Sequence, residues 1–323
     1  MRIASVGIVG GGAWGTALGL VAARAGRRTM IYARDPSTVA AINDNRASPA
    51  HLGSAPPMSA TGDPAELGEC QALILAVPAQ EIRRAFQPFV QVVADGTPIV
   101  IAAKGIELAT GKRLSQVVDE LKPTAEIAVL SGPSFAADVA RNLPTAVTIA
   151  ASRRELALDL CGALSNPTFR PYAETDIVGV ELGGAMKNVL AIGAGIVAGR
   201  RLGASAGAAL VARGFAEMRR FAEAFGARPE TLMGLSGLGD IILTCSSPQS
   251  RNYSVGLALG AGRPIPNLLA EGIATANIAR RLADDNGISM PVTAAVAAVL
   301  AGSLSVDDAT DALMSRPLRA EAD

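Results

Sequence analysis

The chain has 323 residues, half of them hydrophobic, and its 29 basic and 29 acidic side chains give a formal net charge of zero. This length suffices for two domains and a large core, and the balanced charge gives no support to a nucleic-acid partner or an acidic membrane surface. The three cysteines, Cys70, Cys161 and Cys245, form no C-x-x-C pair and no metal-ligand cluster. We therefore expect a cytoplasmic protein with buried free thiols and without a metal site.

Histidine chemistry and membrane insertion are not expected either. The only histidine, His51, stands in a stretch rich in Pro, Ala and Gly that is typical of a surface loop. The longest apolar run, residues 189–198, ends at Arg200 and is shorter than a bilayer span requires. The N-terminus lacks the basic leader and the small-residue cleavage site of a secretory signal.

The first predicted element is a strand over residues 3–9, which runs into a G-x-G-x-x-G turn and a helix over residues 16–25. In such a turn Gly10 permits the tight bend, Gly12 lets the backbone approach a pyrophosphate, and Gly15 lets the helix pack on the strand. The N–H groups at the helix start then face an anion. This context predicts a dinucleotide-binding unit, and a purely structural turn is the alternative.

Short apolar runs and helical segments then alternate along the chain. Strands are predicted over residues 29–33, 72–77, 98–103, 127–130 and 146–150, with helices between them over residues 81–93 and 112–121. Apolar and polar residues alternate poorly along these strands, which is typical of strands buried on both faces. The pattern predicts an α/β fold with a Rossmann-like, doubly wound, mainly parallel sheet.

After about residue 181 the character of the sequence changes, and strand-like runs almost vanish. Helices are predicted over residues 184–198, 206–225, 253–259, 273–285, 291–300 and 306–313. Gly and Pro separate these segments. We therefore predict a dinucleotide-binding domain over residues 1–183 and an all-α substrate-binding and catalytic domain over residues 184–323.

Two predicted strand ends carry residues suited to a ligand site. Lys104 follows the strand over residues 98–103, and Gly132-Pro133-Ser134 follows the strand over residues 127–130. Ligands of open α/β sheets bind beyond the carboxyl ends of the strands, so a functional lysine is expected there. A solvated strand terminus is the alternative for Lys104.

Lys187 is the only charged residue between Glu181 and Arg200, in a segment with small and apolar side chains nearly all round. Burial of an ammonium is costly unless the group is paired, and desolvation lowers the pKa of a lysine toward the range useful for acid–base catalysis. We expect a functional lysine here. The alternative is a side chain that reaches solvent past the helix end.

A third candidate segment spans residues 237–252. Asp240 is isolated between a glycine and an apolar turn, and Thr244 lies one helical turn later. Ser250, Arg251 and Asn252 offer a hydroxyl, a guanidinium and an amide suited to phosphate and sugar oxygens. The alternative is a helix start with Ser250 as its N-cap.

Together these motifs resemble the NAD(P)-dependent glycerol-3-phosphate dehydrogenase family of the bacterial biosynthetic type, over residues 8–299. The matching motifs are residues 10–15, Ala103-Lys104-Gly105, residues 130–136 (Leu-Ser-Gly-Pro-Ser-Phe-Ala), residues 179–189, residues 237–252 and Ala270-Glu271-Gly272. No single motif is decisive, but their common register is specific. Residues 47–60 depart from the family pattern, so nothing is transferred to them.

The resemblance implies NAD(P)H-dependent reduction of dihydroxyacetone phosphate to sn-glycerol 3-phosphate, which supplies the glycerophospholipid backbone. It implies that Lys187 is the proton donor and acceptor, that Lys104 stabilises the developing alkoxide, and that Asp240 orients the lysines. It implies substrate contacts from Lys104, Gly132, Ser134, Lys187, Asp240, Thr244, Ser250, Arg251 and Asn252. The implied cofactor contacts are Gly10, Gly12, Ala13, Trp14, Gly15, Arg34, Lys104, Ala136, Arg251, Leu269 and Glu271. The family also suggests a homodimer.

The end of the second strand bears on cofactor choice. An acidic residue at this terminus suits the ribose diol of NAD, whereas a nearby arginine suits the 2′-phosphate of NADP. Arg34 comes first here and Asp35 follows it. We predict that NADPH is preferred and that NADH is also used.

Two other functions compete with this prediction. A related two-domain reductase of the 3-hydroxyacid or ketopantoate type shares the architecture but acts on carboxylates, and does not require Ser250-Arg251-Asn252 in this register. A non-catalytic dinucleotide sensor would retain the fold without needing Lys187 or Asp240, yet both are present.

Overall fold

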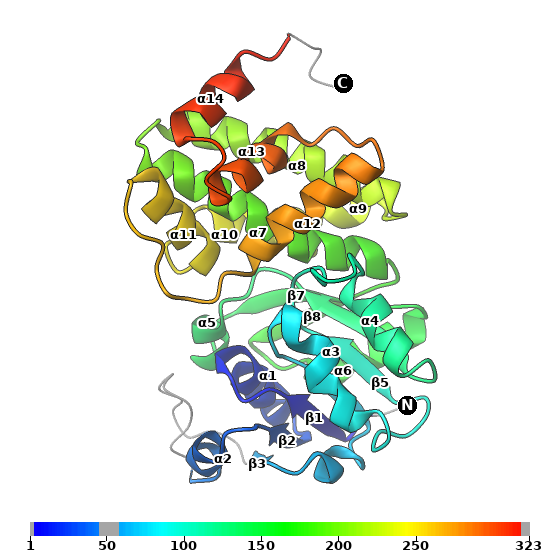
Figure 1. Ribbon diagram of the computed structural model, residues 1–323. Coiled ribbons are helices and arrows are strands. Elements are labelled where there is room, and N and C mark those ends of the chain that lie inside the picture. Colours follow the sequence, from blue (N-terminus) through cyan, green and yellow to red (C-terminus); the bar gives the residue numbers. More distant parts are fainter. Residues whose placement is uncertain (1–2, 45–57, 318–323) are drawn as a thin grey trace. The chain divides into compact units, whose positions relative to one another are not determined.

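The computed structural model describes residues 3–44 and 58–317 (Figure 1). The chain divides into two compact units, which are described separately. The first comprises residues 1–184 together with 225–240, and the second comprises residues 185–224 together with 241–323. The domain boundary after residue 183 stays a prediction. His51 lies outside the described residues.

Within the described residues of the first unit, eight strands form one sheet in the order β3-β2-β1-β4-β5-β6-β7-β8. The strands are β1 (Ser5–Val9), β2 (Arg28–Tyr32), β3 (Ser59–Thr61), β4 (Ala72–Leu75), β5 (Pro98–Ile101), β6 (Glu126–Ser131), β7 (Thr145–Ala151) and β8 (Phe169–Glu174). All neighbours pair in parallel except β6 and β7. The predicted mainly parallel, doubly wound sheet is therefore confirmed, because the first six strands have the Rossmann order.

The central strands β1, β4 and β5 are buried on both faces, as their weak alternation of apolar and polar residues predicted. Ile8 and Val100 belong to one apolar cluster. Val9 and Ile101, each one residue further along its strand, belong to another. Successive side chains of a strand point to opposite faces, so two cores enclose the sheet.

The two edge strands, β3 and β8, were not predicted from the sequence. β3 has only three residues, Ser-Ala-Thr, and depends on its pairing with β2 rather than on an apolar run of its own. β8 begins at the buried Phe169 and contains Pro171, and its other positions are exposed or half-buried. Proline lacks an N–H for the ladder and is tolerated in a strand that pairs on one side, as β8 does with β7.

The helices of the first unit are α1 (Ala13–Arg24), α2 (Pro36–Asn43), α3 (Ile82–Phe86), α4 (Leu114–Leu121), α5 (Ala136–Ala140), α6 (Arg154–Leu164) and α9 (Pro229–Leu232). Short 3-10 turns cover Pro64–Leu67, Ala79–Glu81 and Gln87–Phe89, and a π-helical turn, η4, covers Leu235–Gly239. The continuous helix expected over residues 81–93 is wrong. Pro88 cannot continue an α-helix, so α3 ends at Phe86 and the 3-10 turn Gln87–Phe89, which contains Pro88, follows it.

The second unit is helical in its described part. It contains α8 (Ala204–Ala224), α11 (Arg251–Gly260), α12 (Glu271–Asp285), α13 (Pro291–Leu300) and α14 (Val306–Met314). Two helices cross the division of the chain, namely α7 (Ile177–Gly199) and α10 (Asp240–Cys245). α7 begins earlier than predicted because the Asp176 carboxylate accepts the Gly179 N–H and caps the first turn.

α7 has the length and the apolar composition of a membrane-spanning helix. Its mean hydropathy is 1.4 over an 18-residue window, but 89% of that window is buried inside the protein. The core helix of a soluble protein has the same features, so α7 is weak support for a membrane span.

α7 and α11 cross in direct backbone contact. Gly195 and Gly199 of α7 face the carbonyl oxygens of Tyr253 and Leu257, and Gly256 and Gly260 of α11 face those of Ile192 and Ile196. A Cβ atom at any of these four glycines would overlap the opposing oxygen. The G-x-x-x-G pattern on each helix therefore sets the separation of α7 and α11. At this distance the Cα–H groups of the glycines of one helix contact carbonyl oxygens of the other.

Two of the three cysteines are buried as predicted. Burial raises the pKa of Cys161 to about 11 and also raises the pKa of Cys70. Both thiols therefore carry little thiolate at neutral pH. Cys245 is only half-buried, so the expectation of a buried thiol is wrong there.

Candidate active site

The glycine-rich turn has a distinct geometry at each of its three glycines. Gly10 has φ of +122°, a conformation that L side chains rarely adopt. A Cβ on Gly15 would overlap the Gly10 carbonyl oxygen, so close packing of α1 requires a glycine. At Gly12, the N-cap of α1, a Cβ would meet no atom within 4 Å. The turn thus leaves room for an anion to approach the N–H groups at the start of α1. No acidic residue in the first turn of α1 would repel that anion.

Trp14 links this turn to the neighbouring part of the sheet. Its indole Nε1 donates to the Ala102 carbonyl oxygen at 3.2 Å, just beyond the end of β5. The side chain is half-buried, and its ring packs against the apolar cluster of α1. Trp14 therefore connects the glycine-rich turn to the strand that leads into Lys104.

The end of β2 presents Arg34 and Asp35 differently. Arg34 is exposed. Asp35 is the N-cap of α2, and its carboxylate accepts the Ser37 N–H at 3.0 Å, the Ser37 hydroxyl at 2.6 Å and the Thr38 hydroxyl at 3.0 Å. The Ser37 bonds lower the pKa of Asp35. Asp35 is thus occupied in capping α2, whereas Arg34 faces solvent.

Lys104 is held at the carboxyl ends of β5 and β6. Its Nζ donates to the Gly132 carbonyl oxygen at 3.0 Å and pairs with Asp240 Oδ2 at 2.5 Å. The side chain of Asp240 is 1% exposed, and that of Lys104 is 15% exposed. Ser134 Oγ also donates to the Gly132 carbonyl, at 3.0 Å. The first unit therefore brings Lys104, Gly132, Ser134 and Asp240 together.

The loop that follows Lys104 is fixed by side chains before and within α3. Gln80 donates to the Ile106 carbonyl at 2.8 Å and accepts the Leu108 N–H at 2.9 Å. Arg83 binds Glu107 through two hydrogen bonds of 2.8 and 3.0 Å. The Arg83 bonds hold the pKa of Glu107 below its usual range. This network restricts the loop that begins at Lys104.

The Glu107 contact predicts a pH-dependent stability. A lowered carboxyl pKa stabilises the fold above the unfolded pKa of about 4.3, and this contribution is lost as the pH falls through the folded pKa. Glu107→Gln is expected to lower the free energy of unfolding by about 1 kcal/mol at pH 7, with the difference shrinking toward pH 3. Urea unfolding at several pH values measures it. The exposed Glu69→Gln serves as the control, and an E107Q deficit that does not vary with pH would contradict the assignment.

In the second unit, Lys187 is buried at 8% exposure on α7. Its Nζ donates to the Thr244 hydroxyl of α10 at 2.8 Å. Thr244 is itself 2% exposed. The side chain of Lys187 is therefore enclosed, so the alternative of a side chain that reaches solvent past the helix end is wrong. Its functional role stays a prediction.

The next residue on α7, Asn188, joins three helices of the second unit. Its Oδ1 accepts from Asn252 Nδ2 of α11 at 2.8 Å, and Asn252 Oδ1 accepts the Gly272 N–H of α12 at 2.9 Å. Because Asn188 Oδ1 accepts the bond from Asn252, the orientation of the amide is set, and Nδ2 is its donor atom on the other side. Asn188 was not predicted as a site residue, although its place directly after Lys187 could have indicated it.

Of the remaining predicted residues, one caps a helix and the others are exposed or half-buried. Ser250 caps α11, since its Oγ accepts the Tyr253 N–H at 3.2 Å, so the capping interpretation is confirmed. A substrate contact from Ser250 in addition to this cap stays a prediction. Arg251 and Leu269 are exposed. Ala13 is exposed in the first turn of α1, Ala136 is half-buried in α5, and Glu271 is half-buried at the start of α12.

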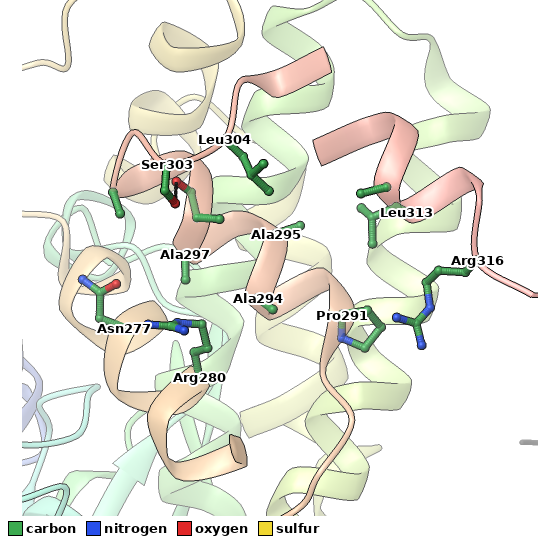
Figure 2. Close-up of a pocket in the computed structure, with 13 residues that line it drawn as sticks. Asn277, Arg280, Pro291, Ala294, Ala295, Ala297, Ser303, Leu304, Leu313 and Arg316 are labelled. Carbon is green, nitrogen blue, oxygen red and sulfur yellow. Dashed lines mark hydrogen bonds between the residues drawn. The ribbon is translucent and has the colours of Figure 1, made fainter. Parts of the chain in front are cut away.

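A separate pocket of about 430 Å³ opens in the second unit (Figure 2). Alanines of α13 line it, with Arg280 of α12 and Arg316 near its edge. None of the predicted site residues lines this pocket. It therefore has no part in the site described above.

Comparison with known proteins covers nearly the whole chain. Residues 5–157 match the family model of the NAD-dependent glycerol-3-phosphate dehydrogenase N-terminus, and residues 176–311 match that of the C-terminus. A glycerol-3-phosphate dehydrogenase [NAD(P)+] from a Bradyrhizobium species is 54% identical over 320 residues, which are 98% of each chain.

Solved structures agree with this relationship. The glycerol-3-phosphate dehydrogenase from Coxiella burnetii superposes with a TM-score of 0.89 and 35% identity, over 98% of this chain and 99% of that one. A ketopantoate reductase from Ralstonia eutropha reaches a TM-score of 0.61 at 17% identity, over 92% and 97%. This second likeness extends to the fold alone. The chain therefore belongs to the NAD-dependent glycerol-3-phosphate dehydrogenase family.

Proposed function

We propose that this chain reduces dihydroxyacetone phosphate to sn-glycerol 3-phosphate with NADPH or NADH, reversibly, and so supplies the backbone of glycerophospholipids. The observation that carries the proposal is the buried ammonium of Lys187, in a family whose relatives are named for this activity. In the reduction, the nicotinamide supplies a hydride to the carbonyl carbon.

Lys187 is the proton donor. Its hydrogen bond to Thr244 fixes the direction of the ammonium, and burial on α7 keeps water from competing for its protons. Lys187 gives one proton to the carbonyl oxygen and becomes a neutral amine. In the reverse direction the amine takes the hydroxyl proton.

Lys104 supplies positive charge for the developing alkoxide. Two of its three N–H donors are directed by the Gly132 carbonyl and by Asp240. Asp240 orients the ammonium, because its carboxylate is almost fully buried and lies 2.5 Å from Lys104 Nζ. The third N–H of Lys104 is the donor available to the substrate.

The other site assignments follow the family motifs residue by residue. Gly132, Ser134, Thr244, Ser250, Arg251 and Asn252 contact the substrate, whose phosphate suits N–H groups, hydroxyls and a guanidinium. Gly10, Gly12, Ala13, Trp14, Gly15, Arg34, Ala136, Arg251, Leu269 and Glu271 contact the cofactor. The open backbone at Gly12 fits the approach of a pyrophosphate.

NADPH is the preferred cofactor in this proposal. The carboxylate of Asp35 is engaged by Ser37 and Thr38, so it is a poor ligand for a ribose diol. Arg34 is exposed at the same strand end and suits the 2′-phosphate.

Arg34→Ala tests this preference. The loss of a charge-assisted bond is expected to raise the KM for NADPH about 10-fold or more and that for NADH less than about threefold. Arg141→Ala removes a half-exposed arginine of the same unit and serves as the control. Equal changes for the two cofactors would overturn the role of Arg34.

The proposal extends to the setting of the enzyme. The dinucleotide-binding domain covers residues 1–183 and the helical catalytic domain residues 184–323. The protein acts in the cytoplasm as a homodimer, without a nucleic-acid partner or membrane insertion. Sedimentation of the purified chain tests the dimer.

The function itself is tested by following NADPH oxidation with three substrates. Dihydroxyacetone phosphate is expected to be reduced efficiently, and dihydroxyacetone, which lacks the phosphate, far more slowly. 2-Ketopantoate tests the rival carboxylate chemistry. Faster turnover of ketopantoate than of the triose phosphate would overturn the proposal.

A further inference from the structure

Two consecutive glycines of α7, Gly183 and Gly184, contact both segments that deliver the Lys104–Asp240 ion pair. The glycines lie in the motif that includes Lys187, but no role has been assigned to them above. Gly184 faces the end of β6 and the stem of Lys104. Gly183 faces η4, the π-helical turn that leads into Asp240.

At Gly184, a Cβ would lie 2.5 Å from Ser131 Oγ, 3.4 Å from Ser131 Cβ and 3.5 Å from Lys104 Cγ. The first distance is too short for any real Cβ contact, whereas the other two are ordinary van der Waals contacts. The absence of a side chain at Gly184 therefore lets the Ser131 hydroxyl lie against α7, beside the Lys104 stem.

Ser131 is an unusual neighbour for this glycine. It is 1% exposed, and among the described residues its Oγ has no hydrogen-bond partner. A buried hydroxyl without a partner loses its hydrogen bonds to water without replacement, so its removal is not expected to destabilise the fold. The overlapping atom belongs to a side chain that is enclosed on all sides, so we expect a Cβ at residue 184 to displace Ser131 and, with it, the adjoining Gly132 whose carbonyl accepts from Lys104.

At Gly183, a Cβ would lie 2.9 Å from the Ser236 carbonyl oxygen and 3.3 Å from Leu232 Cδ2. The nearer atom belongs to the backbone and cannot rotate away. A side chain at this position would push on η4, which ends immediately before Asp240.

We propose that Gly183 and Gly184 are positioning residues that let the Lys104 and Asp240 segments converge on one face of α7. The inference rests on the proposed function, because the Lys104–Asp240 pair is its alkoxide-stabilising element. Each glycine acts through a different partner: Gly184 through Ser131 and Lys104, and Gly183 through the backbone of Ser236.

The test compares Gly184→Ala, Ser131→Ala and the double variant. Gly184→Ala is expected to lower kcat about 10-fold or more, since displacement of a catalytic group by about 1 Å can cost up to 100-fold. Ser131→Ala is expected to retain kcat. The double variant removes the 2.5 Å overlap and is expected to regain kcat to within about threefold of the parent.

Three further measurements separate positioning from general damage. Gly162→Ala changes a helical glycine of the same unit at which a Cβ meets no atom within 4 Å, and it is expected to leave kcat unchanged. NADPH affinity, measured by energy transfer from Trp14, the sole tryptophan, is expected to be unaltered in Gly184→Ala. Gly183→Ala is expected to lower kcat, and Ser131→Ala is not expected to restore it.

Two kinds of failure are distinguishable. If the parent protein does not oxidise NADPH with dihydroxyacetone phosphate, the proposed function fails. If the parent turns over but Gly184→Ala retains its kcat, the positioning role fails. It also fails if the double variant has the same midpoint temperature of unfolding as the parent and its kcat nevertheless stays as low as that of Gly184→Ala.

Discussion

Lys187→Ala is expected to lower kcat for dihydroxyacetone phosphate about 1,000-fold, with little change in the affinity for NADPH. The reason is the loss of the proton donor, because positioned general acids contribute about 100- to 10,000-fold. Steady-state rates of NADPH oxidation measure the effect. Energy transfer from Trp14 to the reduced cofactor measures binding separately.

Two other variants sharpen this prediction. Lys187→Arg keeps a positive charge and N–H donors, but a guanidinium does not release a proton. We expect it to be nearly as slow as the alanine variant, whereas a purely electrostatic role would leave it active. Lys112→Ala, which removes an exposed lysine paired with Glu120, is the control. Parent-like rates in Lys187→Ala would disprove the role of Lys187.

Gly256→Ala is expected to lower the free energy of unfolding by about 3 kcal/mol, the upper range for overpacked cores. The added Cβ overlaps the Ile192 carbonyl oxygen, a backbone atom that no rotamer change can move away. α11 must therefore shift relative to α7. Because α11 carries Arg251 and Asn252, the affinity for the substrate is expected to fall as well. Urea unfolding and the KM for dihydroxyacetone phosphate report these two effects.

Gly207→Ala in α8 is the matched control. A Cβ at Gly207 would lie 3.9 Å from its nearest neighbour, Val197 Cγ1, which is an ordinary van der Waals distance. This variant is expected to stabilise the protein by about 0.5 kcal/mol through lower chain entropy in the unfolded state. If Gly256→Ala is as stable as Gly207→Ala, the close crossing of α7 and α11 is refuted.

The sequence predicted the parts of the fold that local patterns specify. The buried strands around Ile8, Ile74 and Val100 consist of apolar runs. The glycine-rich turn predicted the helix that follows it, although α1 begins at Ala13, three residues before the predicted start. The edge strands β3 and β8 carry no such run, because a strand paired on one side need not be apolar on both faces. Their formation depends on partners that are distant in sequence.

The part of the candidate site that depends on strand order was predictable, and the part that depends on packing between distant segments was not. Lys104 and Gly132 follow neighbouring strands, so their proximity follows from parallel topology. The partnership of Lys187 with Thr244 and that of Lys104 with Asp240 depend on tertiary packing, for which no local pattern exists. The close approach of Ser131 to Gly184 is of the same kind.

Reduction with NADPH deuterated at its transferable C4 position shows whether hydride reaches the triose carbonyl. We expect one sn-glycerol 3-phosphate per NADPH oxidised, with the deuterium on carbon 2, because the carbonyl carbon receives the hydride while Lys187 protonates the oxygen. Mass spectrometry of the product locates the label. Cofactor oxidation that leaves carbon 2 unlabelled would disprove the proposed reduction.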